Sequence, residues 1–220
     1  MTSRRAPPAR RAVPEHNLWM PMCGQTWAGT AASFVGMWAA MMVAMMLPSL
    51  APTLWRYRLA RGTLVGAGYF VVWTVLGLSI FALGAALAEA AMQMPAVARA
   101  VPVSSGMVVL LAGAFQFTAW KAHHLACCRQ APGRDLAFPA NVGMAWRHGV
   151  RLGLHCCYSC AGLTAILLVM GVMDLRAMAI VTAAITAERL APAGERVARA
   201  VGAVSVGAGL VLTARAVWLA

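Results

Sequence analysis

Cysteine and histidine gather in two short segments of the chain, and these segments are the strongest candidates for chemistry. The first runs from Lys121 to Arg129, and its candidate metal ligands are His124, Cys127 and Cys128, with His123 beside them. If this segment is helical, each imidazole faces the thiol four residues later, because residues at that spacing lie on one helical face. Two helical turns would then present imidazoles and thiols side by side.

The second segment holds the remaining candidates, which are His155, Cys156, Cys157 and Cys160. We expect it to open a membrane-spanning helix, on which Cys156 and Cys160 share a face. Cys157 and Cys160 also form a C-x-x-C motif. We expect both segments near the same membrane surface on antiparallel neighbouring helices, so that they converge on one ion.

The available thiols and imidazoles permit either of two metal ions, Zn(II) or Cu(I). A structural Zn(II) site takes four nitrogen or sulfur ligands, whereas Cu(I) accepts two or three soft ones. The alternative is that the cysteines are small buried hydrophobic residues and the histidines polar residues of the membrane interface. Six clustered cysteines, two of the pairs adjacent in sequence, do not fit an extracellular disulfide framework.

Methionines form a third cluster, in the first long apolar stretch. Candidate ligands there are Met41, Met42, Met45 and Met46. At helical spacing they occupy one side of a helix, and thioethers are soft ligands that suit Cu(I). We therefore consider an intramembrane copper relay. The alternative is that methionine only fills irregular gaps between helices.

The elements that must position these residues are transmembrane helices. The 220 residues are 61% hydrophobic and 11% charged, a composition unlike that of soluble domains. We predict an all-α bundle of about six transmembrane helices without a soluble domain. The expected spans are 30–50, 64–88, 103–120, 150–172, 177–187 and 200–219. The fifth is weak, because its uncharged stretch would rise only about 16 Å as a helix.

Positive charge sets the expected orientation. The net charge is +12, and the cations lie between apolar runs, which favours anionic lipid over nucleic acid as a partner. Eleven of the eighteen Lys and Arg fall in loops near 51–63, 121–149 and 188–199 or at adjoining helix ends. The positive-inside rule therefore predicts these loops in the cytoplasm of a multi-pass inner-membrane protein.

We expect two regions in the chain. Residues 1–29 are rich in Arg and Pro and read as a disordered basic arm, and residues 30–220 form the transmembrane domain. No signal peptide is expected, because no short apolar run is followed by a small-residue cleavage site. Small-xxx-small spacing at Gly62 with Gly66, and at Gly149 with Gly153, predicts close helix packing.

Several of these motifs together resemble a known family. They are the Met-Met-x-Ala-Met-Met-Leu-Pro run ending at Pro48, Gln116 with Lys121, Cys128-Arg129, the 153–160 cluster, 171–173 and Glu188-Arg189. Over about residues 36–190 the chain resembles an uncharacterised family of predicted metal-binding integral membrane proteins. The resemblance implies a helical membrane fold and metal binding.

The chain departs from the pattern of that family at three points. His124 stands where the family has its first Cys, and Ser159 stands where the family has another thiol. His155 and Cys157 are then possible substitutes. The chain also has no helix corresponding to the usual first helix of the family.

Three functions follow as hypotheses. The leading one is a membrane protein that binds a soft metal, copper before zinc, for storage, handover or transport, with a protein that delivers or receives the metal as partner. Its first-choice ligands are His124, Cys128, Cys156 and Cys160. The second is a membrane thiol-disulfide oxidoreductase that uses Cys157 and Cys160. The third is a structural subunit whose clusters only pack.

Overall fold

A computed structural model describes residues 26–55, 59–129, 141–172 and 174–218 of the chain. Every regular element in these ranges is an α-helix, which confirms the all-α prediction. The helices are α1 (Trp27–Leu54), α2 (Leu59–Gln93), α3 (Pro95–Phe115), α4 (Ala119–Arg129), α5 (Val142–Met170), α6 (Leu175–Leu190) and α7 (Gly194–Trp218). The expected basic arm lies almost wholly outside the described residues.

Within the described ranges, four helices are long and apolar enough to cross a membrane, namely α1, α2, α5 and α7. The bent pair of α3 and α4 adds a fifth span if the pair is counted as a single span. The prediction of about six spans exceeds this number because α6 has only 16 residues, a rise of about 24 Å. The protein is a multi-pass helical membrane protein.

The third expected span is broken rather than continuous. The chain bends by 65° between α3 and α4, over residues 116–118. At this bend the Thr118 hydroxyl accepts a hydrogen bond from the Lys121 backbone N–H, 3.3 Å away, and so caps the start of α4. The bend turns α4 toward α5 and α6, which it contacts.

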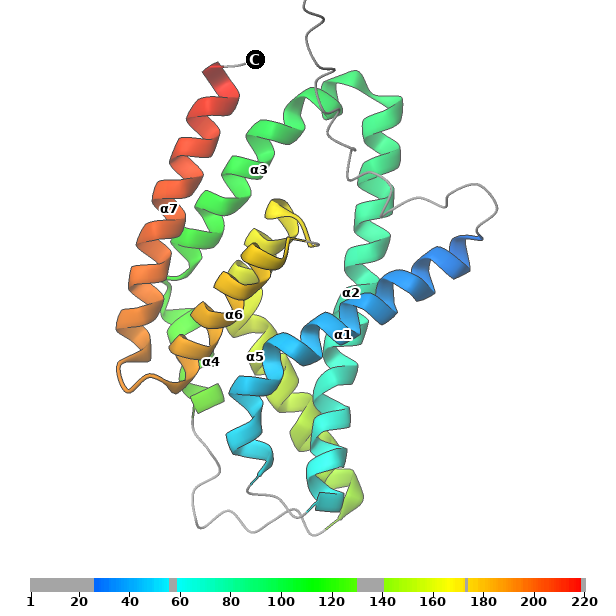
Figure 1. Ribbon diagram of the computed structural model, residues 1–220, viewed down its shortest axis with the longest axis vertical. Coiled ribbons are helices and arrows are strands. Elements are labelled where there is room, and N and C mark those ends of the chain that lie inside the picture. Colours follow the sequence, from blue (N-terminus) through cyan, green and yellow to red (C-terminus); the bar gives the residue numbers. More distant parts are fainter. Residues whose placement is uncertain (1–25, 56–58, 130–140, 173, 219–220) are drawn as a thin grey trace, which may run out of the picture.

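Two helix pairs form the frame of the molecule (Figure 1). α2 packs along α5, and α3 packs along α7, with α6 lying against α1, α5 and α7. α2 approaches α5 closely, since a Cβ at Gly149 would overlap the backbone of Val65 and one at Gly153 would lie 2.9 Å from the Tyr69 carbonyl oxygen. The predicted close packing at Gly149 and Gly153 is therefore confirmed.

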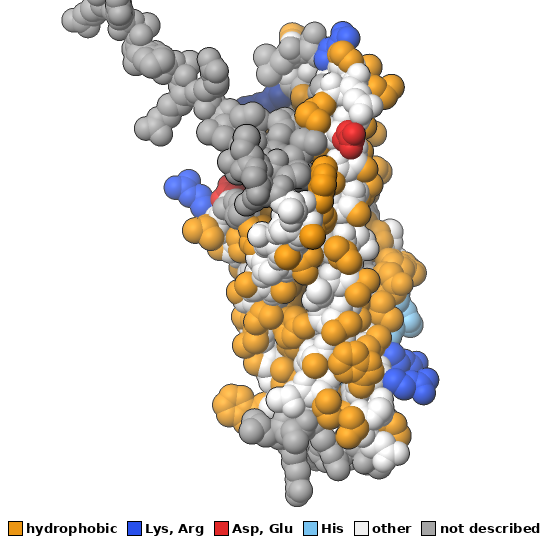
Figure 2. Space-filling model, turned by 90° about the vertical axis from the view of Figure 1, so that its right-hand side faces the viewer, with side chains coloured by type: hydrophobic (Ala, Val, Ile, Leu, Met, Phe, Trp, Pro, Cys, Tyr) orange, Lys and Arg blue, Asp and Glu red, His pale blue; other side chains and the backbone are white. Residues whose placement is uncertain are grey.

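The core is filled from α1, α2 and α5. Its largest fully buried side chains include Trp38, Tyr69 and Trp73, and Trp38 donates a 2.9 Å hydrogen bond from its indole nitrogen to the Trp73 carbonyl. Outside the core, large apolar side chains such as Leu83 and Leu111 are exposed. Figure 2 shows apolar side chains over the middle of one long face, with charged residues toward its ends. This distribution suits a lipid-facing surface.

The start of the fourth expected span is wrong by several residues. We predicted a helix from about residue 150 that opens with the cysteines, but α5 begins at Val142 and continues to Met170. The reason is that residues 142–149, interrupted by Arg147, are too polar to be recognised as membrane-spanning, although they extend the same helix. Cys156 therefore lies in the middle of α5.

Candidate metal site

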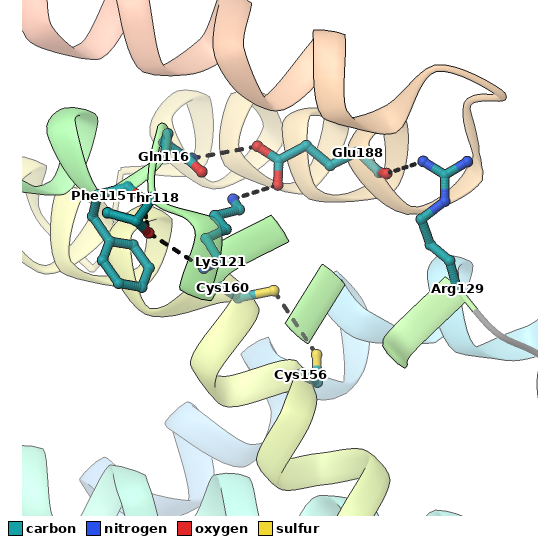
Figure 3. Close-up of polar contacts among 8 residues, drawn as sticks. All are labelled: Phe115, Gln116, Thr118, Lys121, Arg129, Cys156, Cys160 and Glu188. Carbon is teal, nitrogen blue, oxygen red and sulfur yellow. Dashed lines mark hydrogen bonds and ion pairs between the residues drawn. The ribbon is translucent and has the colours of Figure 1, made fainter. Parts of the chain in front are cut away.

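Three sulfur atoms meet in the core, where α5 faces α1. Cys156 Sγ lies 3.8 Å from Cys160 Sγ, one turn further along α5, and 3.9 Å from Met46 Sδ on α1. All three side chains are at most 3% exposed. We call Met46, Cys156 and Cys160 the sulfur cluster. Figure 3 shows Cys156 and Cys160 side by side on α5.

Cys156 also receives two polar donors. The Tyr69 hydroxyl on α2 donates to Cys156 Sγ at 2.9 Å, and Arg189 Nη1 on α6 donates to it at 3.3 Å. Arg189 Nη1 additionally lies 3.0 Å from Ser49 Oγ on α1. Helices α1, α2, α5 and α6 thus converge on one sulfur atom. Donors aimed at a sulfur favour its thiolate form, in which a cysteine binds a metal.

A buried ion pair borders the cluster (Figure 3). Lys121 Nζ on α4 contacts Glu188 Oε2 on α6 at 2.6 Å, and Gln116 donates from its side-chain amide to Glu188 Oε1 at 3.3 Å. Arg129 donates to the backbone carbonyl of Glu188 at 3.2 Å. Glu188 lies in the core, with Lys121 as its partner.

The two histidines predicted as ligands form a separate pair. His124 Nδ1 on α4 and His155 Nδ1 on α5 lie 2.9 Å apart, with the rings of Trp120 and Tyr158 packed against His124. Both histidines are half-buried, so this imidazole pair is nearer the surface than the sulfur cluster. His123 Nε2 lies 3.8 Å from Cys127 Sγ, as expected for its i, i+4 position.

The four first-choice ligands are therefore divided between two places. Cys156 and Cys160 belong to the sulfur cluster, and Cys128 is buried in the same hydrophobic core, whereas His124 pairs with His155. In the part of the chain that the structure describes, no group of three or more His, Cys, Asp or Glu could hold a metal ion. Convergence of both segments on one ion is not seen, because the imidazole pair and the sulfur cluster are separate contacts.

The remaining predicted ligands have simpler positions. Met41, Met42 and Met45 are buried in the core beside Met46, as the predicted helical face requires. Cys157 is half-buried and packs at the edge of that core. The oxidoreductase hypothesis relied on Cys157 near the start of a helix, where thiolates are favoured. Since α5 begins at Val142, that physical basis is wrong.

Sequence reasoning missed two residues of this site. Tyr69 was counted only as part of an apolar span, although a tyrosine hydroxyl inside a membrane helix needs a partner and so marks a polar contact. Arg189 appeared only within a family motif, but its side chain is 7% exposed and contacts Cys156 in the core. Its neighbour Glu188 was the available signal, because adjacent charges of opposite sign suggest an embedded position.

The fold and the site define a class, a multi-pass helical membrane protein with soft sulfur donors enclosed between its helices. A family model described as PpoB2, copper chaperone, matches residues 35–212. Because this match covers more than half of the chain, the protein belongs to the PpoB2 copper chaperone family. No curated protein and no solved structure matches the chain.

Family membership decides the broad function. The protein handles copper, which confirms the leading hypothesis of a membrane protein for a soft metal. A copper chaperone passes its ion to another protein, so handover to a partner belongs to this function. Of what the resemblance to a predicted metal-binding membrane family implied, the helical membrane fold and the handling of a metal are confirmed.

Proposed function

We propose that the protein holds one Cu(I) ion on the sulfur cluster of Met46, Cys156 and Cys160 before handing it to a partner. The observation that carries the proposal is the spacing of the sulfurs around Cys156, 3.8 Å to Cys160 and 3.9 Å to Met46. With metal–sulfur bonds of about 2.3 Å and bond angles of 110–120°, two ligands of one ion lie roughly 3.8–4.0 Å apart. Both distances from Cys156 Sγ therefore match those of two ligands that share one ion.

The chemistry of the donors supports Cu(I) over Zn(II). Two thiols and a thioether form a soft set of three ligands, which suits Cu(I), whereas structural Zn(II) needs a fourth nitrogen or sulfur. Burial strengthens this preference, because an enclosed site keeps water away from a bound Cu(I). Cys128, which is buried in the same core, offers a further thiol.

We propose the imidazole pair of His124 and His155 as the point of exchange. The pair is half-buried, and α4 and α5, which carry it, also carry Cys128 and the cysteines of the sulfur cluster. Imidazole binds copper, so the pair is suited to transient contact with an arriving or departing ion. Cys127 with His123 extends the same surface outward.

The test is Cu(I) binding by the full chain, purified in detergent without oxygen and titrated against a colorimetric Cu(I) chelator. We expect one tightly held ion in the wild type and none in Cys156→Ala/Cys160→Ala. Cys127→Ala/Cys157→Ala removes two cysteines outside the cluster and should keep the ion. His124→Ala/His155→Ala should also keep it but should release it to the chelator more slowly.

A measurement on the wild type guards against misfolded variants. X-ray absorption at the copper edge should show a shell of sulfur neighbours only, at about 2.3 Å. A nitrogen-dominated shell, or full copper retention by Cys156→Ala/Cys160→Ala, would rule out the sulfur cluster as the site.

A further inference from the structure

Arg189 brings a permanent positive charge to the sulfur cluster. Its guanidinium is 7% exposed, and it donates from Nη1 to Cys156 Sγ at 3.3 Å and to Ser49 Oγ at 3.0 Å. Arginine does not lose its proton inside proteins. A buried charge of this kind is costly unless an opposite charge compensates it.

The nearby carboxylate does not compensate Arg189. Glu188 is the adjacent residue, but its carboxylate oxygens contact Lys121 Nζ and the Gln116 amide. Across the described ranges, the Lys121–Glu188 contact is the one ion pair. The group that faces the Arg189 guanidinium is therefore the sulfur of Cys156, with the neutral hydroxyl of Ser49 beside it.

The charge of the bound ion then decides the charge of the whole site. Two thiolates with Cu(I) carry one net negative charge, which Arg189 cancels. Two thiolates with a divalent ion are already neutral, so Arg189 would leave one net positive charge in the core. Because an uncompensated buried charge is strongly unfavourable, the site should discriminate by ionic charge as well as by softness.

We propose that Arg189 is a specificity-determining residue that makes the sulfur cluster selective for monovalent soft cations. This inference rests on the proposed function, since it assigns the same cluster its ion class. Cu(I), and Ag(I) as its redox-inert counterpart, fit a neutral site. Zn(II) is rejected for both its charge and its ligand number, and Cd(II), which is soft but divalent, is rejected for its charge.

The experiment compares the dissociation constants for Cu(I) and Cd(II) in the full chain in detergent. In Arg189→Gln the two affinities should move in opposite directions, weaker for Cu(I) and tighter for Cd(II). We expect their ratio to change by at least about tenfold, given the strength of a charge interaction at this range in a protein interior. A partly unfolded variant would lose both ions, so opposite movements identify the charge as the cause.

Two matched variants separate charge from shape. Arg189→Lys keeps the charge and should retain the preference for Cu(I). Ser49→Ala removes the other hydrogen-bond partner of Arg189 without changing any charge, and it should leave the ratio at the wild-type value.

Each failure has a distinct meaning. If Arg189→Gln weakens the affinities for Cu(I) and Cd(II) equally, or leaves their ratio unchanged, the selectivity role is overturned while the copper site stands. Should Arg189→Gln not fold, the wild type still decides, because equal affinity for Ag(I) and Cd(II) would overturn the proposal. Cu(I) retained by Cys156→Ala/Cys160→Ala would overturn the proposed function itself.

Discussion

At the scale of single residues, the sulfur of Cys156 has both soft and polar neighbours. Its sulfur lies within 4 Å of two other sulfurs and accepts from a phenol and a guanidinium. A cysteine that only filled space would need none of these polar neighbours, since a buried thiol packs as a small apolar group. The packing alternative therefore accounts for the burial of Cys156 but not for the donors aimed at it.

Met46 provides a test that separates ligation from packing. Leucine has a similar volume, so Met46→Leu should cost less than about 1.5 kcal/mol of stability. It removes one of three sulfur donors, however, and we expect Cu(I) affinity to fall at least about tenfold, since even outer-shell changes at metal sites cost that much. The measurement is chelator competition, with thermal unfolding in detergent as the check on stability.

Met41 offers the matched control. It is buried on the same helix at 6% exposure, in the same core cluster. Met41→Leu should leave copper affinity unchanged. Equal loss of affinity in both variants would mean that methionine packing around the core, rather than the Met46 thioether, supports the ion.

Residue spacing predicted part of this site. The i, i+4 rule correctly placed Cys156 with Cys160 and Met46 among the buried methionines. The rule could not predict that α1, α2 and α6 contact Cys156, because contacts between residues far apart in sequence depend on how the helices pack. Tyr69 and Arg189 therefore became part of the site only through the fold.

At the scale of elements, the bend between α3 and α4 is what brings the buried ion pair together. It directs Lys121 toward Glu188 on α6, and the same carboxylate accepts a hydrogen bond from the Gln116 amide at the bend. The sequence predicts a continuous third span, since Gln116 is the one strongly polar residue within 103–120. Only the structure shows the break, together with two interactions that stabilise it, the Thr118 cap and the α4–α6 ion pair.

The ion pair predicts a specific pattern of stability. Lys121→Met leaves the Glu188 carboxylate buried with only the Gln116 amide, and loss of one partner of a buried pair costs about 3–5 kcal/mol. The double variant Lys121→Met/Glu188→Met removes both charges and should recover most of that stability. Unfolding in detergent, followed by the loss of helical circular dichroism, provides the measurement.

The contrast between single and double variants is the informative part. If Lys121→Met is no less stable than the wild type, then α4 is not held to α6 by this contact. If the double variant is as unstable as the single one, the side-chain volumes matter and the charges do not.

At the scale of the whole molecule, the α2–α3 junction lies at one end of the bundle and the α6–α7 junction lies toward the other (Figure 1). The ends of α1 and α4 and the starts of α2 and α5 lie toward the same end as the α6–α7 junction. The three loops predicted to share one side of the membrane therefore lie toward one end of the structure. Two of the eleven cations counted there, Lys121 and Arg189, are buried.

Orientation decides from which compartment copper is exchanged, because α4, which carries the imidazole pair with α5, ends toward the same end as the α6–α7 junction. The positive-inside rule predicts that this end is cytoplasmic.

A specific protease site inserted in the full chain after Pro192, between α6 and α7, should be cut in inside-out membrane vesicles and protected in right-side-out ones. The same site inserted after Met94, between α2 and α3, should show the opposite pattern, since one span of α2 separates the two positions. Cleavage after Pro192 only in right-side-out vesicles would reverse the orientation and would place the exchange of copper on the outer side of the membrane.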